Sequence, residues 1–192
     1  MIDLAALVLS CAPLVAQDTA HALIQVESAG NPFAIGVVGG ALVRQPATLA
    51  EAVATVAALD AAGWNYSVGL GQINKLNFQR FGLTPTTAFA PCANLAALQG
   101  ILSECFFRAR SRAPQQAALR DAFSCYYSGN FATGRQHGYV GKVLAAWSAR
   151  AQQAAVGPVL SHDILAQARF TPSPSPSSRS RSPTQEPRHE PR

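Results

Sequence analysis

Apolar side chains recur every three or four residues along most of this chain, and this spacing places them on one face of an α-helix. The pattern predicts about seven helices, which lie near residues 4–11, 18–28, 49–62, 74–82, 94–112, 114–128 and 139–156. Segments rich in glycine, proline and polar residues separate these helices. We therefore expect a mainly α-helical domain with little strand and no internal repeat.

Capping residues predict where several of these helices begin. Asp18 is expected to cap the second helix and Asn94 the longest one, while Thr48 and Glu51 form a capping box ahead of the third. The last core helix follows Gly138. Its inner side is expected to hold Tyr139, Val143 and Trp147.

Two segments that contain glycine interrupt the helical pattern. Residues 33–40 are typical of a loop or a small hairpin, and residues 63–74 (GWNYSVGLGQIN) place glycines between apolar and polar positions. Because glycine has no side chain, the backbone of such a segment can approach a ligand closely. A tight packing turn is the alternative interpretation of the second segment.

The chain has 192 residues, of which 48% are hydrophobic, and this is enough for one domain with a core. We place that domain at residues 1–158. Residues 159–170 are expected to form a short helix or a linker. Residues 171–192 carry proline, serine and charge but no apolar surface to bury, so they are expected to form a disordered tail.

Charge and hydropathy exclude some classes of protein. No apolar run approaches the ~20 residues of a membrane span, so no transmembrane segment is expected. The apolar N-terminal stretch lacks a basic start and carries Asp3, which makes it a poor secretion signal. The net charge of +5 comes without a cluster of basic and aromatic residues, which argues against nucleic acid and suits an anionic polymer. Arg108, Arg110 and Arg112 favour a solvated basic helix end over a binding patch.

Glu27 is the candidate catalytic residue because it lies on the apolar stripe of the second helix, with Ala20, Leu23 and Ile24. A carboxylate on a buried face in the last turn of a helix loses hydration and meets the negative end of the helix dipole. Both effects raise its pKa. A carboxyl group that holds a proton near neutral pH can act as a general acid. The alternative is a helix-terminal glutamate that simply reaches solvent.

The four cysteines, Cys11, Cys92, Cys105 and Cys125, fit no spacing of zinc ligands. We therefore expect neither a metal site nor a cofactor. Their pairing can occur in three ways, and the sequence pattern does not choose among them. Four buried free thiols are the alternative.

Three separated segments resemble, in order and spacing, the signatures of the soluble lytic transglycosylase family. They are ESAGNPFA (27–34), GLGQI (69–73) and CYYSGN (125–130). Residues 65–78 (NYSVGLGQINKLNF) and the Pro-Ser tail look most like the transglycosylase component of bacterial type IV secretion systems. The similarity covers about residues 9–150, and the three motifs together make it specific.

The resemblance implies a lysozyme-like fold of the α+β superfamily, in which a helical domain holds a cleft for glycan strands. It also implies cleavage of the β-1,4 bond between N-acetylmuramic acid and N-acetylglucosamine of peptidoglycan, with formation of a 1,6-anhydro end. Glu27 matches the single catalytic acid of the family. Tyr126 would hydrogen-bond it. The substrate-binding positions are matched by Ser28, Ser67, Gln72, Tyr126 and Asn130.

The other carboxylates provide an independent check on this resemblance. A glycosidase that uses two carboxylates needs the second one ~5 to 10 Å from the first. None of the other Asp and Glu residues lies in a matched motif, which favours a route assisted by the substrate's own N-acetyl group. Glu51 and Asp60, on the helix before the GLGQI segment, are the remaining candidates for a second acid.

The sequence departs from the family pattern at two positions. Gly71 stands where many members have Met, which would remove one apolar wall of the cleft, and Tyr127 stands where many have Asn. Related secretion-system members imply a disulfide between Cys11 and Cys92, whereas pairing of Cys105 with Cys125 stays open. An oxidising compartment suits a periplasmic wall enzyme. Its export would use a start upstream of residue 1 or another route.

Three functions compete on this basis. The first is a lytic transglycosylase that opens the cell wall for a secretion apparatus, with peptidoglycan and other secretion components as partners. The second is a glycan-binding or assembly module with little turnover. The third is a hydrolytic muramidase, or an endolysin of phage type. Anhydro-muropeptides as products would indicate the first, reducing ends the third, and no products the second.

Overall fold

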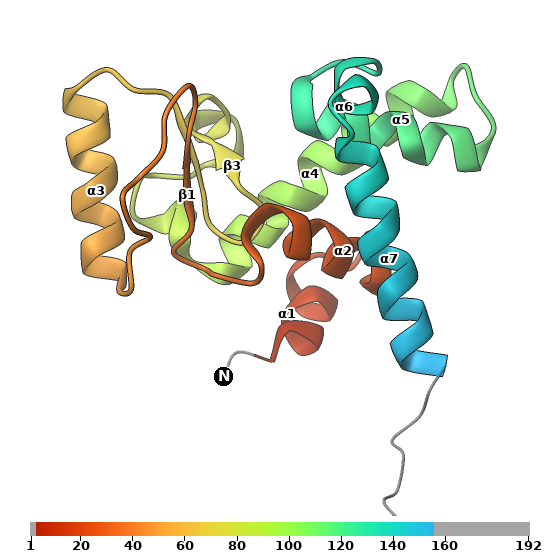
Figure 1. Cartoon of the computed structure of the whole chain (residues 1–192), viewed down its shortest axis with the longest axis horizontal. Coiled ribbons are helices and arrows are strands. Elements are labelled where there is room, and N and C mark those ends of the chain that lie inside the picture. The colour runs from red at the N-terminus through yellow and green to blue at the C-terminus, as the bar shows by residue number, and fades with distance from the viewer. Residues whose placement is uncertain (1–2, 156–192) are drawn as a thin grey trace, which may run out of the picture. The chain divides into compact units, whose positions relative to one another are not determined.

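The computed structural model describes residues 3–155, which form a mainly helical domain as the sequence predicts (Figure 1). Its α-helices are α1 (Leu4–Cys11), α2 (Gln17–Ser28), α3 (Leu49–Ala61), α4 (Pro91–Arg110), α5 (Gln115–Ser128), α6 (Thr133–Gln136) and α7 (Tyr139–Ala155). Three 3-10 turns lie at Lys75–Asn77, Gln79–Phe81 and Thr87–Phe89. The boundary placed at residue 158, the helix or linker at 159–170 and the tail at 171–192 fall outside the described residues.

The two segments with glycine form a small antiparallel sheet. Its strands are β1 (Ile35–Val37), β2 (Tyr66–Val68) and β3 (Ile73–Asn74), in the order β1-β2-β3. Ile35 pairs with Val68, and Val68 also pairs with Ile73, so three buried apolar side chains meet on the sheet. Residues 63–74 therefore supply two strands in addition to the turn between them, and residues 33–40 supply one strand without closing a hairpin of their own.

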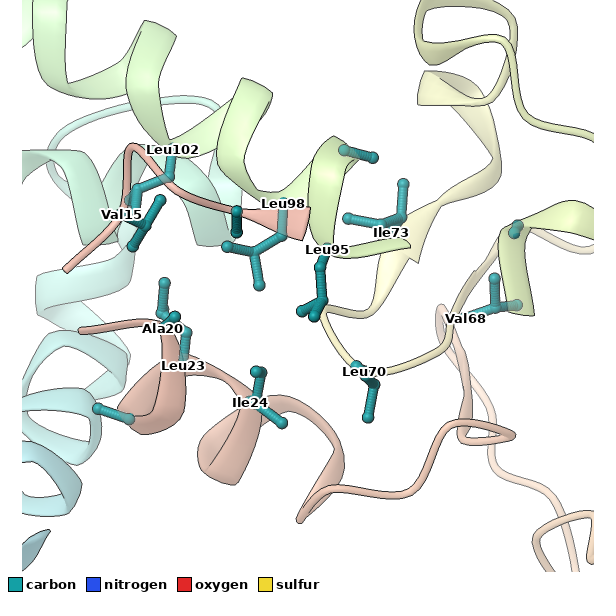
Figure 2. Close-up of a cluster of buried hydrophobic side chains, with 14 of the residues drawn as sticks. Val15, Ala20, Leu23, Ile24, Val68, Leu70, Ile73, Leu95, Leu98 and Leu102 are labelled. Carbon is teal, nitrogen blue, oxygen red and sulfur yellow. The ribbon is translucent and has the colours of Figure 1, made fainter. Parts of the chain in front are cut away.

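The core lies between α2, α4 and the sheet. Figure 2 shows Leu23 and Ile24 of α2 below Leu95 and Leu98 of α4, with Leu70 beside them, and all five side chains are almost completely buried. Helix α2 also packs against α1 and α7, and α4 packs against α5 (Figure 1). The C-terminal end of α2 is thereby held between the helices and the sheet.

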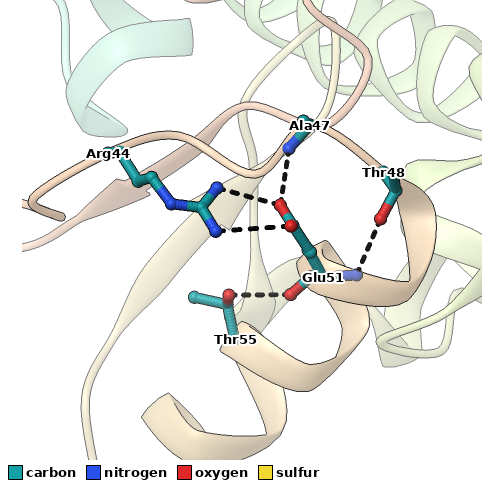
Figure 3. A network of polar contacts seen from close by, with 5 residues as sticks. All are labelled: Arg44, Ala47, Thr48, Glu51 and Thr55. Atoms are coloured by element: carbon teal, nitrogen blue, oxygen red, sulfur yellow. Dashed lines mark hydrogen bonds and ion pairs between the residues drawn. The ribbon is translucent and has the colours of Figure 1, made fainter.

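The start of α3 shows how local polar contacts fix a helix in this domain. Thr48 Oγ1 accepts a hydrogen bond from the Glu51 backbone N–H at 3.2 Å, as the capping box predicts (Figure 3). The Glu51 carboxylate binds the Ala47 N–H and the Arg44 guanidinium, rather than the N–H of Thr48. In the usual capping box the glutamate accepts from the N–H of the cap residue itself, whereas here Glu51 accepts from the N–H of the residue before the cap.

Three predictions about helix residues are wrong. Helix α2 begins at Gln17, so Asp18 lies inside the first turn, where it pairs with Arg150 of α7 instead of capping the helix. Helix α4 begins at Pro91, whose fixed backbone angle suits a first helical residue, and Asn94 is therefore an interior residue. Trp147 keeps 44% of its surface exposed, although Tyr139 and Val143 of the same helix are buried.

Two disulfides tie the helices together. Cys11 of α1 is bonded to Cys92 of α4, which is the pair that the resemblance implies, and Cys105 of α4 is bonded to Cys125 of α5. The interpretation as free thiols is wrong for all four cysteines. Within residues 3–155, no helix combines the length and the apolar character that crossing a bilayer requires.

Candidate active site

A cavity of about 530 Å³ opens beside the end of α2, and we call it the Glu27 cavity. The β-sheet side of the domain and helices α4 and α5 contribute its other walls. Its lining residues are Glu27, Gly36, Val37, Val38, Asn65, Ser67, Gln72, Asn74, Leu76, Asn77, Ile101, Tyr126, Tyr127, Ser128 and Gly129. The three motif segments, which lie far apart in the sequence, thus contribute to one cavity.

Glu27 occupies the last turn of α2 and is partly exposed to the cavity. Burial raises the pKa of Glu27 from its usual 4.5 to about 7, while a hydrogen bond from the Tyr139 hydroxyl to Glu27 Oε1 acts in the opposite direction. A proton is therefore held on this carboxyl group near neutral pH. The alternative of a helix-terminal glutamate in bulk solvent is wrong.

Tyr139 takes the contact with Glu27 that was expected of Tyr126. The Tyr126 hydroxyl instead donates to the backbone carbonyl of Gly71 at 2.5 Å. Burial, reinforced by the nearby Glu27 carboxylate, raises the pKa of both phenols, so both stay protonated and can donate. Tyr139 thus orients the acid, and Tyr126 fixes the loop across from it.

The loop Gly69–Gln72, between β2 and β3, is anchored by a buried amide. Asn94 of α4 accepts from the Gly71 N–H at 2.7 Å and donates to the carbonyls of Val68 at 2.9 Å and Ala88 at 2.8 Å. A side chain at Gly69 would collide with Asn94, since an added Cβ would lie 2.3 Å from Asn94 Nδ2, and the φ angle of +78° also requires glycine. The glycine therefore serves close packing as well as the turn.

Gln72 and Ser67 line the Glu27 cavity. Gln72 has a φ angle of +48°, and its side-chain amide donates to the carbonyls of Ala34 and Gly69. Its Oε1 lies over Gly36 of β1, where an added Cβ would be only 2.7 Å away. Ser67 Oγ accepts a 3.3 Å hydrogen bond from Asn74. Both polar side chains thus combine internal contacts with a position on the cavity wall.

Ser28 and Asn130 are placed differently from expectation, because neither lines the Glu27 cavity. The Ser28 hydroxyl donates to the Leu70 carbonyl at 2.9 Å and so joins the end of α2 to the Gly69–Gln72 loop. The Asn130 side chain accepts from the N–H groups of Ala132 and Thr133 and orders the turn before α6. Their contacts support the site from outside the cavity.

The space beside Gly71 is already filled, contrary to the expected loss of an apolar wall. A Cβ at this position would lie 2.9 Å from Leu98 Cδ1 and 3.0 Å from the Tyr126 hydroxyl. Leu98 of α4 and the ring of Tyr126 therefore occupy the region that a longer side chain at residue 71 would enter.

Glu27 is the sole carboxylate among the described residues that line the cavity. Glu51 is bound to Arg44 at the start of α3, Asp60 accepts from Lys75 and the Tyr66 hydroxyl, and neither residue lines the cavity. Residues 3–155 also hold no group of three or more His, Cys, Asp or Glu side chains placed to bind a metal ion. Among the described residues, Glu27 is thus the carboxyl group that the cavity lining offers for acid or base chemistry.

Sequence reasoning missed the roles of Tyr139, Asn94 and His137. Tyr139 was expected on the inner side of its helix, but no spacing rule connects it with a glutamate 112 residues earlier. Asn94 was interpreted as a cap because asparagine is common there. His137 is hydrogen-bonded through Nδ1 to the hydroxyl of Tyr127 on the cavity wall. It lies at the end of α6, a four-residue helix that carries no periodic signal.

The chain matches a known protein family over most of the described domain. Residues 8–146 match the model of the Transglycosylase SLT domain, which is most of the chain. The chain belongs to the transglycosylase SLT family. No solved structure matches the chain.

Several curated relatives are similar over most of the family domain. The chain is 46% identical to "Type IV secretion system protein virB1" of Brucella suis biovar 1, over 83% of this chain and 70% of the relative. It is 38% identical to "Protein virB1" of Agrobacterium fabrum strain C58, over 71% of this chain and 56% of the relative. "Protein virB1" of Rhizobium radiobacter is 41% identical over 71% of this chain and 57% of its own length. This transglycosylase-family chain thus resembles a Brucella protein named for a type IV secretion system and two further proteins named virB1.

Proposed function

We propose that this chain is a lytic transglycosylase that cuts the β-1,4 bond between N-acetylmuramic acid and N-acetylglucosamine in peptidoglycan. The observation that carries the proposal is one protonated acid, Glu27, facing a cavity whose described lining offers no second carboxylate. A muramidase with two carboxylates would need a partner for Glu27 in that lining. A transglycosylase of this family needs one carboxyl group, which acts first as the acid and then as the base.

Glu27 can perform both proton transfers because its pKa of about 7 leaves it readily protonated and readily deprotonated near neutral pH. In the first step its proton passes to the glycosidic oxygen, the C1–O bond breaks, and the N-acetylglucosamine side leaves as an alcohol. The substrate's N-acetyl carbonyl stabilises the positive charge at C1. In the second step the Glu27 carboxylate takes the proton of the muramoyl 6-hydroxyl, whose oxygen bonds to C1. The 1,6-anhydro ring closes and the acid is regenerated.

The relatives and the cysteines support a cellular setting for this activity. The similar protein of Brucella suis is named as a type IV secretion system protein, and the similar protein of Agrobacterium fabrum is named virB1. Two disulfides in the described residues suit an oxidising compartment such as the periplasm. We therefore place this activity at the cell wall, where it would open the glycan mesh for a type IV secretion system and contact other components of that system.

Digestion of purified peptidoglycan, followed by mass spectrometry, tests the proposal. The wild-type chain should release 1,6-anhydro-muropeptides, and Glu27→Gln should lower that release by at least about a thousandfold, because the amide cannot supply the proton. Glu104→Gln is the matched control: Glu104 pairs with Arg80 and does not line the cavity, so its release should stay normal. Reducing ends as products, or normal release from Glu27→Gln, would contradict the proposal.

A further inference from the structure

Tyr127 has no part in the proton transfers, yet it occupies a prominent place on the cavity wall. It lies at the end of α5, next to Tyr126, and 46% of its surface is exposed. Most large apolar side chains of the domain are buried, and an aromatic side chain left half-exposed in a cavity is typical of a ligand-binding surface.

The Tyr127 ring is held in one orientation by two neighbours. One of its faces stacks on Tyr139, with ring centroids 4.7 Å apart and an interplanar angle of 23°. Its hydroxyl is hydrogen-bonded to His137 Nδ1 at 3.2 Å, and the His137 ring meets it edge to face at 5.8 Å. Tyr139 is buried and covers one face of the Tyr127 ring, while Tyr127 itself is half-exposed and belongs to the lining of the Glu27 cavity.

The geometry points to Tyr127 as a sugar-stacking residue, whose free ring face receives one pyranose ring of the glycan strand beside Glu27, and to His137 as the residue that positions that ring. A pyranose presents C–H groups on its flat face, and these carry a partial positive charge that suits the negative face of an aromatic ring. The inference deepens the proposed function and rests on a glycan as the ligand.

The surrounding wall fits the same occupant. Ser128 and Gly129 continue the wall beyond Tyr127, while Asn74 and Asn77 lie in the same cavity lining and offer amides to hydroxyl and acetamido groups. A flat apolar surface together with amide side chains is what a neutral N-acetyl sugar needs. The lining contains no Lys or Arg among its described residues, so an anionic group is a poorer match at this wall.

Binding should be measured in the Glu27→Gln background, so that cleavage does not alter the ligand. The probe is insoluble purified peptidoglycan, with the bound fraction measured by co-sedimentation. Tyr127→Ala should weaken binding roughly 3- to 10-fold, the size of one aromatic stacking contact, whereas Tyr127→Phe should retain most of it. His137→Ala should give an intermediate loss, since the ring remains but its anchor is gone.

Phe107→Ala is the matched control, because Phe107 is 72% exposed on α4 and does not line the cavity. Its binding should equal that of the Glu27→Gln parent. Melting temperatures must show that each variant is folded. In the otherwise wild-type chain, Tyr127→Ala should raise the substrate concentration for half-maximal rate more than it lowers the maximal rate.

Three results would overturn the inference: unchanged binding by Tyr127→Ala, an equal loss in Phe107→Ala, or a loss confined to the maximal rate. The last would mean that Tyr127 acts only through Tyr139. These outcomes are separable from failure of the proposed function. If the wild-type chain yields reducing ends instead of anhydro ends, the binding results for Tyr127 still support stacking, because a muramidase binds the same strands.

Discussion

A carboxyl group that loses much of its hydration keeps its proton to higher pH, and Glu27 is such a group. Its helix ends one residue later at Ser28, so the side chain stands beside the cavity with the C-terminal dipole of α2 behind it. The Tyr139 hydroxyl is the one side-chain donor that the described structure gives to this carboxyl group. At the scale of a single residue, catalysis and stability therefore depend on the same proton.

We expect Glu27→Gln to change how stability depends on pH. The raised pKa means that the folded state holds the proton while the unfolded state has lost it, so wild-type stability falls as pH rises from about 4.5 to about 7. The loss is at most about 3 kcal/mol, and contact with cavity water reduces it. The variant should match the wild type near pH 4 and exceed it near pH 8, as measured by urea unfolding. Equal stability at both pH values would contradict the burial of a proton here.

Tyr139→Phe should shift the pH profile as well as the rate. The Tyr139 hydrogen bond lowers the pKa of Glu27, so its loss raises that pKa and moves the alkaline limb of the activity profile to higher pH. Looser placement of the acid should lower the maximal rate by roughly 10- to 100-fold. Turnover of peptidoglycan between pH 5 and pH 9 measures both. Trp147→Phe, on an exposed side of α7, is the control and should leave the profile in place.

At the scale of elements, Asn94 links helix α4 to the loop that faces Glu27. Its amide satisfies the backbone of β2, of the Gly69–Gln72 loop and of the segment before α4. A buried polar group with all its partners specifies one arrangement of the elements around it, because any other arrangement leaves donors and acceptors unpaired. The loop conformation is therefore set by a helix rather than by its own glycines alone.

Asn94→Ala should both destabilise the domain and impair the site. Removing the amide leaves one N–H and two carbonyl groups buried without partners, which costs about 3 kcal/mol or more. The control is Gln99→Ala, since Gln99 lies on α4 as Asn94 does. This change removes a single exposed hydrogen bond, from the Leu14 N–H to Gln99 Oε1, and should cost less than about 1 kcal/mol. Thermal unfolding and peptidoglycan digestion of both variants measure the contrast. A similar cost for the two would show that the Asn94 network is dispensable.

The sequence predicts elements well where they are periodic and poorly where they depend on contacts between distant segments. The stripes of α2 and α4 and the cap at Thr48 follow from local spacing. The sheet does not, because β1 pairs with β2 across the whole of α3. For the site, the sequence motifs contain Glu27 and Gln72, which line one cavity. Tyr139, which hydrogen-bonds Glu27, lies outside these motifs on α7 and reaches Glu27 only through tertiary packing.

At the scale of the whole described domain, the two disulfides differ in the length of chain they close. Cys11 and Cys92 are 81 residues apart, so their bond joins α1 to α4 and closes a loop of chain that contains all three strands. Cys105 and Cys125 are 20 residues apart, and their bond joins the consecutive helices α4 and α5. A cross-link that closes a longer loop removes more freedom from the unfolded chain.

Removing the long-range disulfide should therefore cost more. Loop closure predicts about 4 to 5 kcal/mol for Cys11→Ser with Cys92→Ser, and about 3 kcal/mol for Cys105→Ser with Cys125→Ser. The second pair ends one residue before Tyr126, so its loss should also lower activity in protein that is still folded. Denaturant unfolding and digestion assays of the two double variants measure this. The reverse order of stability would contradict the loop-closure account.

The outer edge of β1 has a further consequence for how the protein behaves at high concentration. The Gln45 side chain accepts from the Ile35 N–H and donates to the Ile35 carbonyl, and the Gly40 N–H covers the carbonyl of Val37. The Gln45 side chain thus makes the two hydrogen bonds with Ile35 that a fourth strand would otherwise make. Molecules meeting along this side find few free backbone groups on which to assemble, so the small sheet is protected against growing into an aggregate.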